Sequence, residues 1–420
     1  MKCILPSMAL VLALLASPAL RPAAAEDWPC WRGPNRDAVC EEKGLLQAWP
    51  DGGPRLLWKT TGVGEGYSGP AVVGNMLYTM GNGNGKQWIV ALDVTRKGQQ
   101  VWASATGGIH HDGGGFPGPR STPTIDGDRL YTLGVAGELV CMNLRDGTIR
   151  WQHHMVRDFG GAIPTWGYAE SVLIDGDRLI CTPGGRQATL AALNKLTGEP
   201  VWKSPIGDGA CYSSIIKATI GNIPQYVAFV SNGVVGVRAS DGQFLWRYNA
   251  PALTKNGGIS IATPIAYGQT IFAAAGYGVG GGLVWVRPVG RQFQPRQVYF
   301  TKDMKNHHGG LIRLGDYLYG CNDPGILTCL NYKTGKVVWR SREPGKCSLL
   351  YADGMLYCRD EKGPISLVEA TPEGFRMKGR FQQPGRSNKN AWPHLVIADG
   401  RMYVRDQDAL LCYDVRAAKR

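Results

Sequence analysis

Residues 328–339 read Thr-Cys-Leu-Asn-Tyr-Lys-Thr-Gly-Lys-Val-Val-Trp, which is two short apolar runs on either side of a turn. The first run ends at Asn331, the turn closes on Gly335, and the second run ends at Trp339. Alternating apolar residues around a glycine that can adopt a positive φ are typical of a β-hairpin. The same Gly-x-x-x-Trp spacing recurs at Gly98/Trp102, Gly147/Trp151, Gly198/Trp202 and Gly242/Trp246.

The spacing of these hairpins predicts the type of repeat. Gly98 and Gly335 are 237 residues apart. This corresponds to five steps of roughly 47 residues if one unit between Gly242 and Gly335 has lost its tryptophan. A period of this length is typical of the four-stranded blade of a β-propeller.

A second repeated pattern predicts the number of blades. Tight turns of Gly with Asp, Asn or Gln, flanked by apolar runs, suit two-residue hairpins. They occur eight times, at residues 72–78, 125–131, 174–180, 218–227, 266–272, 313–319, 351–357 and 397–403. In each blade this turn would join the inner strands A and B, and the Gly-x-x-x-Trp hairpin would join the outer strands C and D. The sequence therefore predicts an all-β, eight-bladed propeller of four-stranded antiparallel blades over residues 56–415.

The two ends of the repeat predict how the ring closes. Residues 409–415 form a last apolar run, and only the basic tail 416–420 follows, so the eighth blade lacks a D strand. Residues 56–59, Leu-Leu-Trp-Lys, have the composition of a D strand. We expect this N-terminal strand to complete the last blade and remove its open edge. The fifth and seventh blades lack the tryptophan, and we expect their outer strands at 283–289 and 296–302, and at 365–370 and 375–380.

The N-terminal residues before the repeat divide into two segments. Residues 1–25 combine Lys2, a short apolar core and Ala23-Ala24-Ala25, which predicts a secretory signal peptide. Residues 26–55 are rich in Trp and Pro and match no repeat, so we expect a strap packed on the propeller. We therefore predict a soluble, exported protein, periplasmic or extracellular, with no transmembrane segment.

Charge and cysteine content narrow the function further. The formal charge of +13 becomes +11 when Lys2 and Arg21 are removed with the signal. The basic residues are spread over many turns without a Lys/Arg block, which argues against a nucleic-acid partner. Export would place the remaining cysteines in an oxidising compartment. The disulfide candidates are Cys30/Cys40 first, then Cys321/Cys329 and Cys347/Cys358, whereas Cys141, Cys181, Cys211 and Cys412 read as buried strand residues.

The two faces of a propeller blade carry different connections, and this predicts where a ligand binds. The A–B and C–D turns, which are short and repeated here, define the turn face. The D–A and B–C connections define the loop face, and here they are long and unrepeated, as at 103–120, 153–168, 249–261 and 382–392. Variable loops on a rigid scaffold usually hold the binding residues.

The loop face carries the candidate site residues at or just before the innermost strands. They are Arg120, Trp166, Tyr168, Glu170, Asn306, His307, His308, Trp392 and His394. Candidate metal ligands are His110, His111, Asp112, His307 and His308. Adjacent histidines on an extended chain point in opposite directions, so each pair would offer one inward ligand. We therefore favour a hydrogen-bonded polar lining over a metal site.

The repeated phrase, with Ala-Leu-Asp or a similar run before its turn, resembles the tryptophan-docking repeat of the PQQ-like, quinoprotein-dehydrogenase-like β-propellers. Exported bacterial members of that family labelled BamB-like share the opening Trp-Pro-x-Trp-Arg-Gly-Pro, here Trp28–Pro34. Other matching phrases are Gly118–Pro123, Asn306–Gly310 and Arg405–Asp408. The resemblance covers nearly all of residues 56–415 and implies the propeller fold.

The resemblance also implies two functions. We favour a non-catalytic binding or scaffold protein of the cell envelope, a monomer without cofactor, that takes an envelope protein, peptide or glycan on its loop face. The alternative is a dehydrogenase of alcohols or sugars that depends on pyrroloquinoline quinone (PQQ) and calcium. There the quinone would stack on Trp166 or Trp392 and be held by Arg120 and Glu170. Family dehydrogenases cover the quinone with a disulfide between adjacent cysteines, and this sequence has no such pair. A third possibility is a metal-dependent enzyme that uses the paired histidines.

Overall fold

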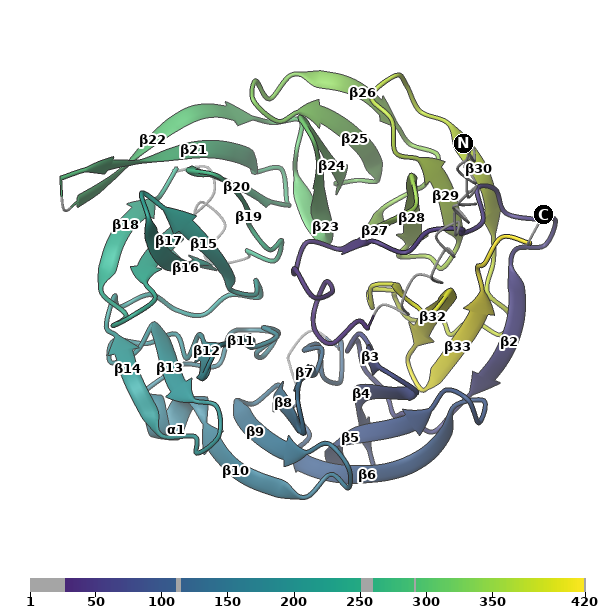
Figure 1. Cartoon of the computed structure of the whole chain (residues 1–420), viewed down its shortest axis with the longest axis horizontal. Helices are drawn as coiled ribbons and strands as arrows, with labels where there is room; N and C mark the ends of the chain where they lie inside the picture. The colour runs from purple at the N-terminus through teal and green to yellow at the C-terminus, as the bar shows by residue number, and fades with distance from the viewer. Residues whose placement is uncertain (1–26, 111–114, 251–259, 291, 419–420) are drawn as a thin grey trace, which may run out of the picture.

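Eight antiparallel sheets stand around a central axis and form a closed disc (Figure 1). The computed structural model describes residues 27–110, 115–250, 260–290 and 292–418. Seven sheets have four strands, and the sheet of blade 7 has a fifth strand contributed by the N-terminal segment. The predicted eight-bladed, all-β propeller is confirmed.

Blades 1 to 4 follow one another from their inner to their outer strands. Blade 1 contains β3 (Ala71–Val73), β4 (Met76–Gly83), β5 (Lys86–Asp93) and β6 (Gln99–Gly108). Blade 2 contains β7 (Thr124–Asp126), β8 (Arg129–Leu133), β9 (Glu138–Asn143) and β10 (Ile149–His154), after which comes the helix α1 (Met155–Phe159). Blade 3 contains β11 (Leu173–Asp175), β12 (Arg178–Cys181), β13 (Leu190–Asn194) and β14 (Pro200–Ser204). Blade 4 contains β15 (Ile216–Ile220), β16 (Ile223–Val230), β17 (Gly233–Arg238) and β18 (Phe244–Tyr248).

Blades 5 to 8 complete the ring in the same order. Blade 5 contains β19 (Ile265–Tyr267), β20 (Thr270–Ala275), β21 (Gly280–Val289) and β22 (Gln292–Thr301). Blade 6 contains β23 (Asn306–Leu314), β24 (Tyr317–Asn322), β25 (Ile326–Asn331) and β26 (Val337–Ser341). Blade 7 contains β27 (Cys347–Ala352), β28 (Met355–Asp360), β29 (Ile365–Glu369) and β30 (Met377–Phe381), with β1 (Val39–Cys40) beside β27. Blade 8 contains β31 (Val396–Ala398), β32 (Arg401–Asp406), β33 (Ala409–Asp414) and the N-terminal β2 (Arg55–Thr60).

Closure of the ring follows the prediction. Strand β2 pairs antiparallel with β33, with Leu56 opposite Tyr413 and Thr60 opposite Leu410. The outer strands of blade 5 include most of the predicted ranges 283–289 and 296–302, but they begin earlier, at Gly280 and Gln292, because their pairing continues out to Val289 opposite Gln292. Those of blade 7 are β29 and β30, and β30 begins at Met377 rather than at 375 because Glu369 N first bonds Arg376 O across the turn.

The Gly-x-x-x-Trp hairpin joins neighbouring blades. The indole of Trp102 in blade 1 lies against Gly147 of blade 2, where a Cβ would come within 2.5 Å of the ring. The same indole donates from Nε1 to Leu144 O of blade 2 at 3.3 Å. Equivalent close approaches occur for Trp58 on Gly98, Trp151 on Gly198, and Trp202 on Gly242. Each glycine therefore serves twice, because it makes its own turn at positive φ and also leaves room for the tryptophan of the preceding blade.

Blade 5 replaces this tryptophan with a tyrosine. Tyr299 lies against Gly335, where a Cβ would come within 2.4 Å of the ring. The Tyr299 hydroxyl donates to Tyr332 O at 2.7 Å. The contact that the tryptophan makes in other blades is thus kept, although the sequence motif is lost.

The strap enters the central channel from the turn face. Asp27 accepts a hydrogen bond from Gly74 N, in the A–B turn of blade 1, at 2.7 Å. Trp28 then exchanges backbone hydrogen bonds with Val72, and Pro29 O accepts one from Ile125 N of blade 2. These bonds carry the chain along the inner edges of two blades and into the ring (Figure 1).

The strap turns inside the channel and leaves by the same face. Positive φ at Arg32, Gly33, Arg36 and Ala38 reverses its direction. Strand β1 then runs parallel to β27, with Val39 opposite Tyr351. Glu42 accepts hydrogen bonds from the backbone amides of the A–B turn of blade 8 at 2.6 and 2.7 Å. Residues 31–37 are therefore the tip of a plug in the channel.

The ten cysteines of the described chain are buried free thiols. The expected Cys30–Cys40 disulfide is not formed, because the two thiols face different parts of the protein. Cys30 Sγ donates to Gly33 O, and Cys40 Sγ faces Ile397 O of blade 8. The pairs Cys321/Cys329 and Cys347/Cys358 are not formed either. Cys329 lies opposite Tyr319, and Cys358 lies opposite Leu349, so each pair is out of register.

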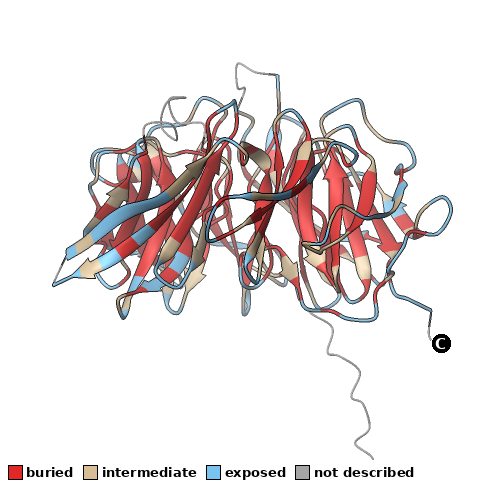
Figure 2. Ribbon diagram, turned by 90° about the horizontal axis from the view of Figure 1, so that it is seen from above, coloured by how far each residue is buried: buried red, intermediate tan, exposed pale blue. Residues whose placement is uncertain are grey.

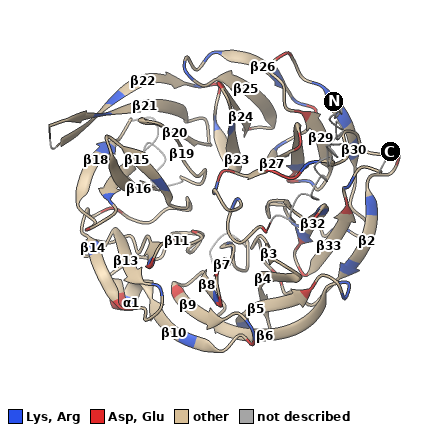
Figure 3. Cartoon of the chain, viewed as in Figure 1, with Lys and Arg blue, Asp and Glu red and all other residues tan. Residues whose placement is uncertain are grey.

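Burial follows the blades. Figure 2 shows buried residues along the strands and exposed residues at the turns and on the outer strands. Lys and Arg residues lie around the whole disc, mixed with Asp and Glu (Figure 3). In the part of the chain that the structure describes, no helix has the length and apolar character needed to cross a bilayer.

Candidate ligand-binding pocket at the loop face

One pocket, with a volume of about 370 Å³, lies at the loop-face end of the channel. All eight blades contribute to its lining, mostly through residues just before their innermost strands. The lining includes Tyr67, Phe116, Arg120, Trp166, Tyr212, Ala262, His308, Lys346 and Trp392, of which His308 lies within β23. The pocket is thus built from the unrepeated residues of the propeller.

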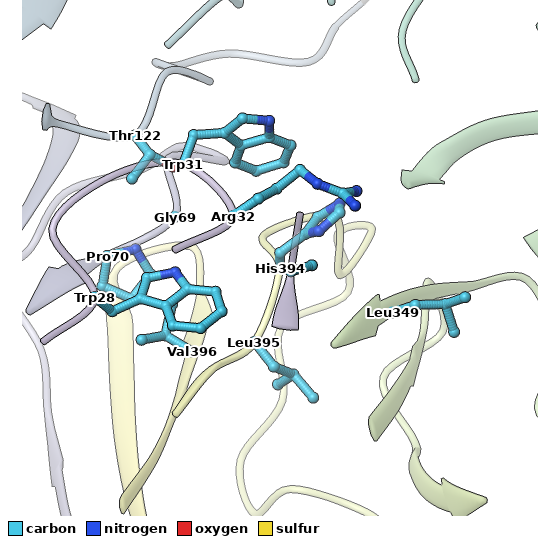
Figure 4. A pocket seen from close by; sticks show the side chains of 11 residues that line it. Trp28, Trp31, Arg32, Gly69, Pro70, Thr122, Leu349, His394, Leu395 and Val396 are labelled. Atoms are coloured by element: carbon cyan, nitrogen blue, oxygen red, sulfur yellow. The ribbon is translucent and has the colours of Figure 1, made fainter. Parts of the chain in front are cut away.

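The tip of the strap forms the floor of the pocket. Trp31 and Arg32 line it, and the Trp31 and His394 rings lie 4.6 Å apart. Figure 4 shows these three side chains among those around a smaller cavity beside the pocket. The Arg32 guanidinium donates to Asp37 O at 2.8 Å and to Leu311 O of blade 6. A second cavity beside these residues measures only about 10 Å³, so the plug is closely packed. The strap therefore closes the pocket on the side away from the loop face.

Burial sets the charge state of the floor. It lowers the pKa of Arg32 to about 10, which still leaves the guanidinium charged at neutral pH. It also lowers the pKa of His394 to about 3, with a further contribution from the Arg32 charge. The neutral His394 donates from Nε2 to His308 O at 2.9 Å. This bond fixes the His394 ring beside Trp31.

Blades 1 to 4 give one side of the pocket an aromatic lining. We call Tyr67, Phe116, Trp166 and Tyr212 the aromatic arc. The Trp166 and Tyr212 rings are 5.7 Å apart. Tyr67 and Phe116 each lie 4.9 Å from Trp392 of blade 8. Packing between these tilted rings fixes their orientation in the pocket wall.

Arg120 shapes the loop that carries part of this arc. Its guanidinium donates to Phe116 O at 2.7 Å and to Gly118 O at 3.1 Å. It also lies 6.0 Å from the centre of the Tyr67 ring. Arg120 therefore links the backbone of the blade 2 loop to the aromatic surface of blade 1.

Blades 6 and 7 give the opposite side a polar lining. We call His307, His308, Lys346 and Glu361 the polar arc. Lys346 Nζ lies 2.9 Å from Asp323 Oδ1 and 3.8 Å from Glu361 Oε2. Glu361 Oε2 also lies 3.1 Å from His308 Nε2. The arc is joined to the aromatic side by Trp392, whose Nε1 donates to Glu361 at 3.2 Å.

The electrostatics of the polar arc keep Glu361 and the neighbouring Asp323 ionised and His307 neutral. Burial would raise the pKa of Glu361, but the bonds from His308 and Trp392 and the Lys346 charge outweigh it and lower the pKa to about 2. Burial, with repulsion from His308 and Lys346, lowers the pKa of His307 to about 3. The pKa of Asp323 is lowered, since the bonds from Tyr277 N and Lys346 outweigh its burial.

The structure brings six of the nine candidate site residues into this pocket. They are Arg120, Trp166, His307, His308, Trp392 and His394. The other three lie behind its wall. Tyr168 donates to Pro183 O at 2.7 Å, and Asn306 Nδ2 donates to Gly310 O and Cys321 O. Glu170 is 1 % exposed and accepts from Thr182 N at 2.8 Å.

The candidate metal ligands are not assembled in the described structure. His111 and Asp112 lie outside the described residues, and His110 does not line the pocket. The rings of His307 and His308 are 5.2 Å apart and contact different carboxylates. Among the residues that can be described, no three His, Cys, Asp or Glu side chains are grouped to hold a metal ion.

Several pocket residues were missed from the sequence. Tyr67, Phe116 and Tyr212 each precede an innermost strand, which is the position that should have singled them out. Glu361 lies in the short loop between β28 and β29, where nothing in the sequence pattern marks it. The strap residues Trp31 and Arg32 were missed because the strap's route into the channel has no repeated signal.

Comparisons with known proteins place the chain in a family. The family model described as outer membrane protein assembly factor BamB, a PQQ-type repeat model, matches residues 85–341. The chain belongs to this BamB family of PQQ-like propellers. BamB of Burkholderia pseudomallei (strain K96243) is 22% identical over 289 residues, which span 66% of this chain and 67% of that protein.

Two solved structures share the fold. BamB from Moraxella catarrhalis superposes with a TM-score of 0.58 at 14% identity, covering 87% of this chain and 98% of that one. A europium-containing methanol dehydrogenase superposes with a TM-score of 0.54 at 12% identity, covering 90% and 89%. The fold is therefore shared between BamB proteins and dehydrogenases, so function must be argued from the pocket.

The pocket residues do not supply the donors that a calcium-bound quinone needs. Calcium takes six to eight oxygen ligands. The Glu361 carboxylate is shared among His308, Trp392 and Lys346. Glu170, which was expected to hold the quinone together with Arg120, is buried behind the wall, where burial raises its pKa to about 8. The cations and aromatic rings could still bind an organic ligand without a metal.

Proposed function

We propose that the chain is an exported, non-catalytic binding or scaffold protein of the cell envelope, and that its ligand docks in the loop-face pocket. The observation that carries this proposal is the pocket itself. Unrepeated side chains from all eight blades converge on it, while the strap closes its floor. A rigid ring with one open, aromatic-rich cavity is typical of ligand binding.

Family membership supports the envelope location. The matching family and the relatives in Burkholderia pseudomallei and Shewanella oneidensis are named for the assembly of outer membrane proteins. The apolar segment within residues 1–25 supports export. We infer that the protein acts as a monomer without cofactor, and that an envelope protein, peptide or glycan is its partner.

The alternative is a PQQ-dependent dehydrogenase. It is favoured by the position of Trp166, Trp392 and Arg120 in the pocket and by the fold shared with a methanol dehydrogenase. The donor set around Glu361 disfavours it, because a metal would have to compete with Lys346 and His308 for that carboxylate.

One experiment separates the two. The full chain is expressed in a host with two membranes, fractionated, purified from the periplasm and mixed with PQQ and calcium. We expect the protein in the periplasmic fraction, no change in its melting temperature, and no dye reduction with alcohols or sugars. Dye reduction above the protein-free blank would overturn the proposal in favour of the dehydrogenase. Retention in the cytoplasm would overturn the envelope role.

A further inference from the structure

We propose that the loop-face pocket binds a neutral saccharide ring. This inference rests on the proposed binding function and names the ligand class. The pocket has two chemically different sides, the aromatic arc of blades 1 to 4 and the polar arc of blades 6 and 7. A sugar ring has the matching asymmetry, with C–H groups on its faces and hydroxyl groups around its edge.

The aromatic arc offers flat surfaces for the C–H faces. The Trp166–Tyr212 pair and the group of Tyr67, Phe116 and Trp392 form two such surfaces, and both line the same pocket. Aromatic side chains bury a large apolar area and lose little freedom when a ligand binds. Their partners within the protein already hold these rings in place.

The polar arc offers hydrogen-bonding groups of both kinds for the hydroxyl edge. Lys346 is a donor, Glu361 is an acceptor, and Asn390 of blade 8 can be both. The Lys346 and Glu361 side chains are 21% and 24% exposed, so each keeps part of its surface open. A hydroxyl group donates and accepts at once, and so it can bond to such a mixed pair without a charge of its own.

The charges of the lining argue against a charged ligand. Aromatic surfaces alone would suit an organic cation, but Arg32, Arg120 and Lys346 all line the pocket and would repel one. An anion would face the ionised Glu361. It would also have to compete for cations that already bond to protein oxygens, as Arg32 does with Asp37 O and Lys346 with Asp323. A neutral ligand avoids both costs.

The strap argues against an extended peptide. A peptide strand would pair with the inner edge of a blade. The strap already takes the inner edges of blades 7, 1 and 2, where β1 pairs with β27, Trp28 bonds to Val72, and Pro29 O accepts from Ile125 N. The closed floor also stops a chain from threading through the ring. A ring at the end of a glycan can enter from the loop face and stop against Trp31.

The test uses the purified full chain on an array of neutral and acidic oligosaccharides, with an acidic and a basic decapeptide as further probes. The best array ligand is then titrated by calorimetry at about 0.05 M and about 0.5 M salt, a range over which charge interactions at a surface are largely screened. We expect a neutral oligosaccharide to bind best, with an affinity that changes less than twofold across this range.

Two variants and one control locate the ligand. Trp166→Ala should weaken binding at least tenfold, because it removes one of the two aromatic surfaces. Trp285→Ala, an equal change at an exposed tryptophan of blade 5 outside the pocket, should leave it unchanged. Glu361→Gln should weaken the binding of a neutral saccharide roughly tenfold, because it removes a charged acceptor. The same change would strengthen the binding of an anion.

The outcomes also separate this inference from the proposed function. Saturable binding of a peptide, but of no saccharide, that is lost in Trp166→Ala would overturn the saccharide and keep the binding role. Preference for an acidic saccharide, with a strong salt dependence and a tighter Glu361→Gln variant, would overturn neutrality. Array binding that survives Trp166→Ala unchanged would overturn the pocket as the site.

Discussion

The turn face and the loop face of this propeller are built from the same strands but by opposite kinds of sequence. On the turn face, four tryptophans meet the glycine of the next blade in nearly the same way, as Trp102 meets Gly147 and Trp202 meets Gly242. On the loop face, each blade contributes a different residue to one pocket. The repeated residues therefore hold the ring together, and we propose that the unrepeated ones determine what it binds.

This difference predicts that stability and binding can be separated by mutation. Turn-face residues fill space between blades, so their loss leaves cavities or clashes. Loop-face residues border an open pocket, so their loss removes few contacts within the protein and, under the proposed function, contacts with the ligand. The predictions below test this division in order of decreasing effect on stability.

The largest loss of stability is expected for Trp202→Ala. Trp202 is buried against Gly242, and its Nε1 donates to Ala239 O at 3.3 Å. Truncating a buried tryptophan leaves a cavity that costs about 3–5 kcal/mol of the free energy of unfolding. Chemical denaturation measures the change. Trp285→Ala is the control. Because Trp285 is exposed, this change should lower the free energy of unfolding by less than about 1 kcal/mol. Equal losses would mean that the repeated tryptophans do not hold the blades.

Two carboxylates of the loop face extend the comparison. Burial raises the pKa of Glu170 from its usual 4.5 to about 8, whereas hydrogen bonds and charges lower that of Glu361 to about 2. A carboxyl group whose pKa is raised on folding holds its proton in the folded state and loses it in the unfolded state. Between pH 4.5 and about 8 it therefore lowers the free energy of unfolding as the pH rises.

We expect Glu170→Gln to remove this contribution. The wild-type free energy of unfolding should fall relative to that of the variant by up to about 1.4 kcal/mol per pH unit within that window. Glu361→Gln should show the opposite sign at lower pH, because the stability from Glu361 is present above pH 4.5 and is lost as the pH falls toward 2. Denaturation curves of the three proteins at several pH values measure both. Parallel curves for wild type and Glu170→Gln would place Glu170 in contact with solvent.

A smaller loss is expected for Gly147→Ala. Gly147 has a φ of 72°, and a Cβ there would come within 2.5 Å of Trp102 and Ser104. The backbone strain and the clash together should cost about 2–3 kcal/mol. Gly176→Ala separates the two causes, since Gly176 has a φ of 60° but no atom within 4 Å of a Cβ. It should cost about 1 kcal/mol. Equal values for both variants would mean that docking of Trp102 contributes nothing.

The fold could be predicted from the sequence because each blade contains the residues that its own turns require. Gly335 needs its positive φ whatever surrounds it, and the hairpin chemistry recurs often enough to count the blades. Blade 5 lacks the tryptophan but keeps the contact between blades, since Tyr299 packs on Gly335 of blade 6. Local chemistry is readable from sequence when it is repeated.

The pocket was only partly predictable, because it depends on where the chain returns in space. Trp166, Trp392 and Arg120 were singled out as unusual residues before innermost strands. Glu170 shares that position, yet its side chain points behind the wall toward Thr182 N. The floor depends on the reversal of the strap at Arg32 and Ala38, both with positive φ. No pattern in the sequence marks such a reversal, so neither the free state of Cys30 nor the closed channel was foreseen.

The smallest effect on stability is expected for Trp166→Ala. Trp166 is half-buried in the pocket wall, and its described contacts are the Tyr212 ring and a backbone bond to the Tyr212 hydroxyl. The backbone bond does not need the indole, so the loss should stay below about 1 kcal/mol. Denaturation of Trp166→Ala and Trp202→Ala side by side compares one tryptophan from each face. A loss at Trp166 as large as that at Trp202 would show that the pocket wall also holds the ring together, because only a residue packed between blades can contribute that much.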